Sequence, residues 1–234
     1  MIKRQFQGTR HFSVLINLLR DRSLFLQEVR AGISLDKKNT ALFICSSLFF
    51  AIYGAIMGSF HSWEQALSSA VKLPALYLIT LIICFPTLYF FNILFGSQRT
   101  FGQHFAMLLT AVAVISVLLF SFAPITLFFL ISTFNYQFFT LLNVAILSIT
   151  GFIGIKFLYQ GMRLLAEEDT EGIETRMRLL RFWLILYAFV GTQLAWTLRP
   201  FFGRPGTSFV LFRELDGNFY LSIFQAIQEI LGIY

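Results

Sequence analysis

The chain has 234 residues, of which 57% are hydrophobic and 13% are charged. A soluble domain carries about 25% charged residues, so this composition excludes an ordinary water-soluble domain and indicates a surface covered largely by lipid. The net charge of +6 comes from basic residues that flank apolar runs and lack the aromatic-interleaved pattern of a nucleic-acid-binding surface. We therefore expect a protein embedded in the lipid bilayer, with no nucleic-acid partner.

Five apolar runs are long enough to cross a bilayer, whose hydrocarbon core takes about 20 helical residues. They predict an all-α, polytopic transmembrane helical bundle with spans near 41–60, 73–95, 105–131, 138–159 and 182–202. The chain then divides into a cytoplasmic segment over 1–40, a five-span membrane domain over 41–202, and an outer-face loop and helix over 203–234.

Both ends of the chain carry amphipathic stretches. His11–Arg30 sets apolar residues at helical spacing opposite basic ones, which predicts one helix that lies in the cytoplasmic interface or packs on the protein's own cytosolic face. Asn218–Tyr234 has an apolar stripe with polar breaks and is short for a span. It predicts a second interfacial helix, with a sixth span as the alternative. His61–Lys72 is expected to be a short polar link, with an interfacial helix anchored by Trp63 as the alternative.

Small residues and prolines mark special positions within the spans. Gly54 and Gly58 form a small-xxx-small pair, which lets another helix approach closely. Pro74 falls near the expected start of the second span, where first-turn amides lack partners in any case. Pro86 in mid-span predicts a bend at 84–86, and Pro124 is expected to end the third regular helix early.

Polar side chains in or beside the spans are the candidate interaction residues. Asn92 and Asn143 suit hydrogen bonds between helices. Gln193, Trp196 and Arg199 recur every third residue, so on a helix they share one face. We expect Arg199 to act as a clamp that pins the following loop onto the outer face of the bundle. Its candidate partners are the last carbonyls of its helix, Asn143, Glu214 and Asp216.

The sequence offers no set of residues for catalysis or metal binding. His11, His61 and His104 fall in three different polar segments, and the spans contain no Asp or Glu. Cys45 and Cys84 lie inside spans without the spacing of metal ligands, and no hydrolase, protease or nucleotide-binding motif is present. We therefore expect no catalytic, cofactor or metal site, and the protein is not predicted to be an enzyme.

The distribution of basic residues predicts the orientation. Segments 1–40, 96–104 and 160–181 hold most of them and alternate with segments that hold few. The positive-inside rule then places the N-terminus in the cytoplasm and the C-terminus outside. Five carboxylates within 160–181 are interpreted as part of a solvated cytosolic loop. The location we expect is a bacterial inner membrane.

Several strings resemble the Yip domain family of polytopic membrane proteins, more specifically a bacterial group related to it. They are Lys72–Pro74, Pro86–Tyr89, Gly191–Trp196 and Leu198–Phe201, and the resemblance covers roughly residues 40–220. It implies five spans with the N-terminus inside. Eukaryotic members bind small GTPases, but the chain lacks their Asp-Leu-Tyr-Gly-Pro string before the first span, which argues against a GTPase partner.

Three functional hypotheses follow from these features. The leading one is a non-catalytic scaffold or accessory subunit that associates with the bilayer and with other membrane proteins or itself. The alternative is a channel or transporter for a small solute. A third is a pigment- or haem-associated subunit that uses His61 or His104 as axial ligand.

Overall fold

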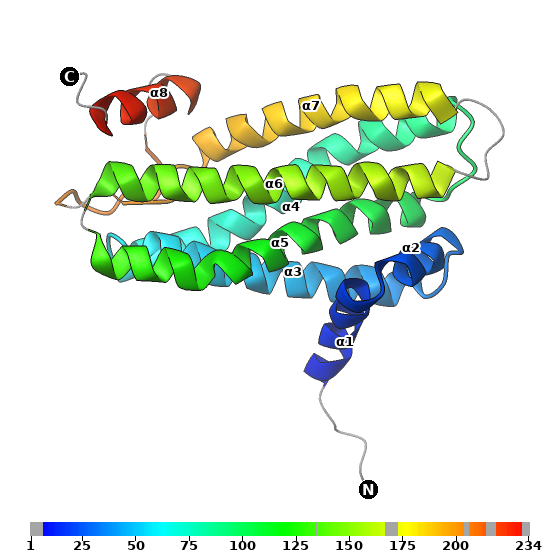
Figure 1. Ribbon diagram of the computed structural model, residues 1–234, viewed down its shortest axis with the longest axis horizontal. Helices are drawn as coiled ribbons and strands as arrows, with labels where there is room; N and C mark the ends of the chain where they lie inside the picture. The colour runs from blue at the N-terminus through cyan, green and yellow to red at the C-terminus, as the bar shows by residue number, and fades with distance from the viewer. Residues whose placement is uncertain (1–6, 134, 167–172, 204–205, 214–218, 231–234) are drawn as a thin grey trace, which may run out of the picture.

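Eight α-helices and no strands make up the part of the chain that the computed structural model describes, residues 7–133, 135–166, 173–203, 206–213 and 219–230. The helices are α1 (Gln7–Arg20), α2 (Arg22–Arg30), α3 (Leu35–Gly58), α4 (Trp63–Leu94), α5 (Phe101–Ser132), α6 (Tyr136–Ala166), α7 (Ile173–Thr197) and α8 (Phe219–Ile230). Figure 1 shows α3 to α7 running side by side along the long axis of the molecule.

These five helices confirm the predicted transmembrane bundle. They are 24 to 32 residues long and apolar enough to cross a membrane. At 1.5 Å per residue even the shortest reaches about 36 Å, which exceeds the hydrocarbon core of about 30 Å. The protein is therefore a polytopic α-helical membrane protein. All five helices begin before the predicted spans because helical structure continues into the polar flanks, whereas α3, α4 and α7 end before the predicted span ends.

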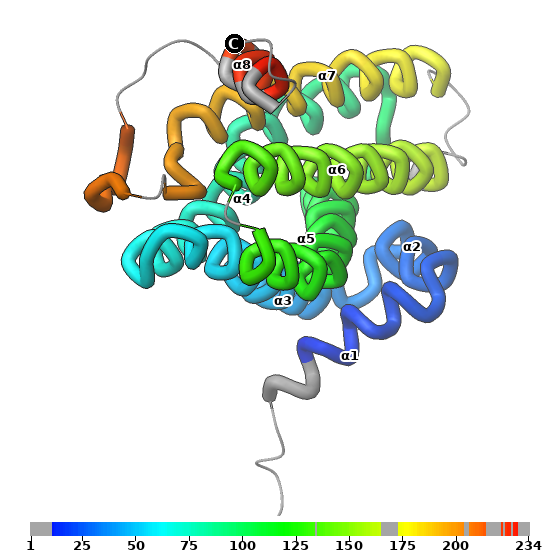
Figure 2. The backbone as a smooth tube through the Cα atoms, turned by 60° about the vertical axis from the view of Figure 1, so that its left-hand side comes forward, coloured from blue at the N-terminus to red at the C-terminus, as the bar shows by residue number. Residues whose placement is uncertain are grey.

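The bundle is organised around α3 and α5. Helix α3 packs against α4, α5 and α1, while α5 also packs against α6, and α7 lies mainly on α4. Figure 2 shows α8 beside the end of α7 and next to α6. We call this end of the bundle the cap end, and the opposite end, where α2 lies, the α2 end.

The predicted N-terminal amphipathic helix is two helices rather than one. The carboxylate of Asp21 accepts a hydrogen bond from the Leu24 amide at 3.0 Å and so caps α2, which interrupts the helical run. This bond, together with one from Ser23, lowers the pKa of the Asp21 carboxyl. Helix α1 buries Leu15 and Leu18 and exposes Phe12, Ile16 and Leu19.

Helix α2 packs on the protein itself, which is one of the two arrangements predicted for this stretch. It buries Phe25, Leu26 and Val29. The Lys38 ammonium at the start of α3 pairs with the Glu28 carboxylate at 3.0 Å. The same ammonium donates a hydrogen bond to the Ile33 carbonyl at 2.7 Å, so the turn between α2 and α3 is fixed at both ends.

The predictions for Pro74 and Pro124 are wrong, the linker before the second span belongs to the helix of that span, and the bend at Pro86 stays a prediction. The expected link His61–Lys72 is mostly the first turns of α4, so Pro74 lies well inside this helix rather than at its start. Pro86 also lies within the continuous helix, and Pro124 does not end α5, which continues to Ser132. A transmembrane helix can include proline because packing against its neighbours and hydrogen bonds from them satisfy the backbone groups that the ring frees.

A hydrogen bond from α7 reaches the backbone of α4 close to Pro86. The indole N–H of Trp183 donates to the carbonyl of Cys84 at 2.9 Å, and both side chains are buried. Trp183 thereby fixes the position of α7 against the proline-containing part of α4.

Gly54 and Gly58 lie where α3 and α4 approach most closely. A Cβ atom at Gly54 would collide with the backbone carbonyl of Ser69, and one at Gly58 would collide with the carbonyl of Gln65. Both contacts involve backbone atoms of α4, which cannot move aside as a flexible side chain can. The glycine pair therefore allows the contact between α3 and α4.

Candidate functional site

The segment after α7 folds into a closed loop at the cap end, which we call the cap segment (residues 198–213, described except for 204 and 205). Helix α7 ends at Thr197, and the chain then leaves helical structure. The backbone N–H of Arg213 donates to the carbonyl of Arg199 at 3.2 Å, so the two ends of the loop lie together. A loop whose ends meet in this way presents one defined surface.

Three buried polar side chains of α4 hold the cap segment, and we call them the polar row: Gln65, Ser69 and Lys72. Their spacing of four and then three residues sets them on one face of the helix. The Gln65 amide donates to the Pro200 carbonyl at 2.8 Å, and the Ser69 hydroxyl donates to the Phe201 carbonyl at 2.7 Å.

Lys72 joins the two sides of the loop. Its ammonium donates to the carbonyl of Pro200 at 3.3 Å and to the carbonyl of Leu211. It also lies 4.7 Å from the ring centre of Phe212. A buried ammonium is costly unless it is paired or hydrogen-bonded, and these carbonyls and the aromatic face compensate it. One side chain thus fixes both the beginning and the end of the cap segment.

The middle of the cap segment is held by His61, which precedes α4. The ring Nε2 of His61 lies 2.8 Å from the Thr207 carbonyl. Gly203 packs directly on the imidazole, where a Cβ atom would collide with the ring. Phe202 then packs edge-on against Phe139 of α6, with ring centres 6.1 Å apart. The loop therefore contacts both α4 and α6.

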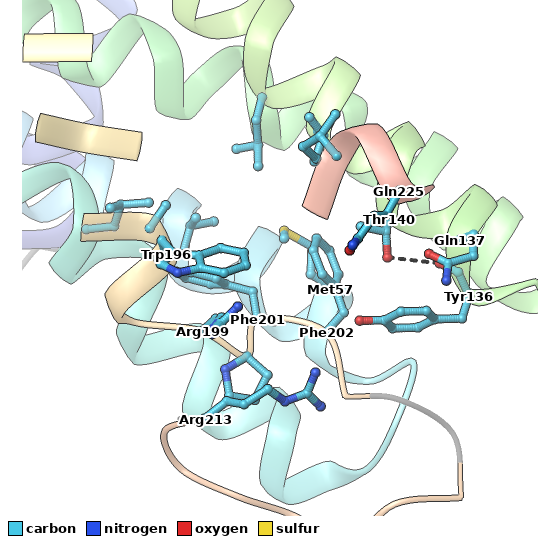
Figure 3. Close-up of a pocket in the computed structure, with 17 residues that line it drawn as sticks. Met57, Tyr136, Gln137, Thr140, Trp196, Arg199, Phe201, Phe202, Arg213 and Gln225 are labelled. Atoms are coloured by element: carbon cyan, nitrogen blue, oxygen red, sulfur yellow. Dashed lines mark hydrogen bonds between the residues drawn. The ribbon is translucent and has the colours of Figure 1, made fainter. Parts of the chain in front are cut away.

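A cavity of about 430 Å³ lies between the cap segment and the bundle (Figure 3). Side chains from α3, α4, α6, α7, the cap segment and α8 line it. They are Met57, Leu73, Leu76, Tyr136, Gln137, Thr140, Val144, Leu147, Ala195, Trp196, Arg199, Pro200, Phe201, Phe202, Arg213, Ile223 and Gln225. This volume falls within the range of small-molecule sites, about 300–1,000 Å³.

The charged part of the cavity wall comes from the cap segment. The guanidinium of Arg199 lies 3.4 Å from the ring centre of Trp196, close enough for a cation–π contact. Arg213 contributes a second guanidinium and is exposed. Figure 3 shows both arginines on the cap-segment side, with Tyr136 and Gln137 of α6 across the cavity. The described lining residues include no Asp or Glu.

The structure revises the predicted role of Arg199. Because α7 ends before it, Arg199 is not on a helical face with Gln193 and Trp196, and that prediction is wrong. Trp196 and Arg199 do line one cavity, whereas Gln193 is not among its described lining residues. The expected partners Glu214 and Asp216 lie outside the described residues. The polar row and His61 bond to the cap segment, and the clamp role of Arg199 stays a prediction.

The two predicted asparagines form hydrogen bonds inside the bundle. Asn143 is fully buried and accepts a hydrogen bond from the Tyr53 hydroxyl at 2.8 Å, which links α6 to α3. The Tyr53 hydroxyl also lies 3.1 Å from that of Thr126 on α5. Asn143 donates to the Phe139 carbonyl of its own helix, and Asn92 donates to the Leu88 carbonyl. Asn143 therefore bonds to α3 rather than to Arg199.

This network predicts a measurable loss of stability for Tyr53→Phe. The substitution keeps the ring and removes both hydroxyl contacts, so the Asn143 carbonyl oxygen is left buried without its donor. We expect the free energy of unfolding to fall by about 1–3 kcal/mol. Thermal unfolding in detergent measures the change, with Tyr159→Phe, at a hydroxyl without a described hydrogen bond, as control. Equal melting temperatures for both variants would contradict the role of the network.

Sequence reasoning missed the residues that anchor the cap segment. Gln65, Ser69 and Lys72 all fall in the segment that the sequence predicts to be a polar link, and Lys72 also belongs to the Lys72–Pro74 string of the family resemblance. The available signal was their spacing, which continues one helical face from the second span into its polar flank. Their partners are backbone carbonyls more than a hundred residues away, which no local pattern identifies.

Metal ligands do not gather in the described part of the chain, where no three His, Cys, Asp or Glu side chains lie close enough to hold an ion. His61 is at the cap end, whereas His104 is buried near the start of α5, with its Nδ1 3.1 Å from the Thr100 carbonyl.

Comparison of the chain with protein-family models, with curated proteins and with solved structures gave no match. The resemblance to the Yip domain family is therefore still a prediction from the quoted strings. The structure adds the five-helix bundle, the anchored cap segment and the cavity beneath it as the features from which function can be argued.

Proposed function

We propose that this chain is a non-catalytic scaffold or accessory subunit that binds other membrane proteins through its cap segment. One observation carries the proposal: a loop anchored by a row of buried polar side chains presents Val210, Leu211 and Phe212 to the outside. Leu211 is 53% exposed and Phe212 is 58% exposed. Adjacent exposed apolar side chains on a fixed loop are typical of an interaction surface.

The hydrogen bonds that anchor the cap segment to α4 favour a protein partner over general contact with lipid. Lipid accounts for apolar side chains along the spans, but it does not require a loop backbone of one shape. Association costs less free energy when the binding surface is already ordered, since little conformational entropy is lost. The bonds from Lys72 to the Pro200 and Leu211 carbonyls keep the loop backbone ordered next to the exposed apolar side chains of 210–212.

We place the protein in a bacterial inner membrane with the N-terminus in the cytoplasm, so that the cap end faces outward. The basic segments between the spans support this orientation through the positive-inside rule. We favour the scaffold over a channel or transporter because the amides of Asn92 and Asn143 form hydrogen bonds within the bundle, where they support helix packing and not the binding of a solute. The partner protein would then contact the cap segment at the outer face of the inner membrane.

Photo-crosslinking from position 212 tests the proposal. A photoreactive amino acid replaces Phe212 in cells that make the full chain, and a matched variant carries it at Ile82, an exposed position on α4. We expect one discrete cross-linked product of reproducible mass from position 212 only. Blue-native electrophoresis should show a complex larger than the monomer, and the Phe212→Asp substitution should dissociate that complex.

Two differently tagged copies of the chain distinguish self-association from binding to another protein. Recovery of one tag with the other supports a homo-oligomer, and a cross-linked product without the second tag supports a different subunit. A monomer on the native gel, or the same product from positions 82 and 212, would overturn the proposal.

A further inference from the structure

We propose that the cavity beneath the cap segment binds an acidic amphiphile, with a phosphate headgroup at the arginines and an acyl chain against the apolar wall. This site is separate from the exposed tip at Val210–Phe212 and does not depend on a protein partner. Three features carry the inference: the charge of the cavity wall, the change in polarity along it, and its place at the end of a transmembrane bundle.

The charge of the wall selects an anion. Arg199 and Arg213 are the charged members of the described lining, and no described lining residue is acidic. Guanidinium groups form paired hydrogen bonds with phosphate oxygens, and these bonds are roughly twice as strong as neutral ones. Arg213 is exposed and so can reorient toward a ligand without breaking a buried contact.

The polarity of the wall changes along α6 from the cap end inward. Tyr136, Gln137 and Thr140 line the cavity at the start of the helix, and Val144 and Leu147 follow further along. From the first to the last of these, α6 advances about 16 Å at 1.5 Å per residue.

The deeper wall is apolar on another helix as well. Leu73 and Leu76 of α4 contribute to it. A ligand that fits such a cavity has a charged, hydrogen-bonding head and a hydrocarbon tail, since each part then meets a wall of its own kind.

Trp196 supplies a further polar group beside the arginines. Its indole N–H is shielded from solvent and has no hydrogen-bond partner among the described residues. A buried donor without a partner calls for an explanation such as an absent ligand or water. Trp196 also lies under the Arg199 guanidinium, which helps to hold that cation at the cavity wall.

The bilayer itself is the source of ligand to which we commit. The cavity is lined by the first turns of α6 and the last turn of α7, both of which are membrane-spanning helices, so its charged end lies at the level of lipid headgroups. A phospholipid places its phosphate at that level and its acyl chains deeper, which matches the order of the wall. Free phosphate shares only the headgroup chemistry.

Native mass spectrometry of the purified full chain in a non-ionic detergent tests this proposal. The probes are dioleoyl phosphatidic acid and dioleoyl phosphatidylcholine, which differ in headgroup but not in chains. We expect one molecule of phosphatidic acid to bind per chain, and we expect it to bind more tightly than phosphatidylcholine does. Arg213→Gln should weaken that binding about tenfold, and Val144→Trp, which fills the apolar part, should also weaken it.

The controls separate a defined site from general attraction to a basic protein. Arg178→Gln removes an exposed arginine near the start of α7, away from the cavity, and should leave binding unchanged. Equal losses from Arg178→Gln and Arg213→Gln, or equal binding of the two lipids, would overturn the proposal. Displacement of the lipid by inorganic phosphate at equal concentration would also overturn it, because the apolar wall would then contribute nothing.

Discussion

Gly54→Ala should strongly destabilise the protein. The added Cβ atom meets the backbone carbonyl of Ser69, so α3 and α4 must move apart along their closest contact. Overpacking of this kind costs about 1–3 kcal/mol and occasionally more. Thermal unfolding in detergent and the amount of protein in the membrane should both fall.

Gly151→Ala is the matched control for this prediction. Gly151 lies within α6, and a Cβ atom there would meet nothing within 4 Å. Since alanine favours helix over glycine by up to about 1 kcal/mol, this variant should be as stable as the original chain or slightly more so. If the two alanine variants unfold at the same temperature, the close approach at Gly54 is not what limits the packing of α3 on α4.

The membrane helices could be located from the sequence because hydropathy is a local property. Gly54 and Gly58 were recognisable for the same reason, since a spacing of four residues sets them on one face regardless of the partner. Hydropathy could not show where α4 begins. Its first turns carry polar side chains that donate hydrogen bonds to backbone carbonyls of the cap segment and do not face lipid. The apolar run therefore starts later along the chain than the helix does.

The candidate site was only partly accessible to sequence reasoning. Trp196 and Arg199 could be noticed in the sequence as an aromatic and a basic side chain at the end of a span, and the structure places both in the wall of one cavity. The stacking of Arg199 on the Trp196 ring could not be predicted from the sequence. It requires α7 to end before Arg199, so that the chain can turn the guanidinium back over the indole. The cavity also needs Arg213 and α8, whose positions follow from long-range packing.

The second large effect is expected from Lys72→Met, which keeps much of the side-chain length and removes the ammonium. The carbonyls of Pro200 and Leu211 then lose their charged donor, and hydrogen bonds to charged groups contribute about 1.5–3 kcal/mol. The loss should concentrate in the cap segment. Exchange of the Arg213 amide hydrogen, which closes the loop on Arg199, should become about 10- to 100-fold faster.

Global stability should change less than this local exchange does. Replacing a buried charge by an apolar side chain removes the cost of dehydrating the ammonium, which offsets part of the lost hydrogen bonding. Lys156→Met, at an exposed position of α6, serves as control and should leave the Arg213 amide protected. Hydrogen exchange followed by mass spectrometry measures both variants. An unchanged Arg213 amide in Lys72→Met would mean that Gln65, Ser69 and His61 hold the cap segment without the lysine, and that the polar row does not act through its charge.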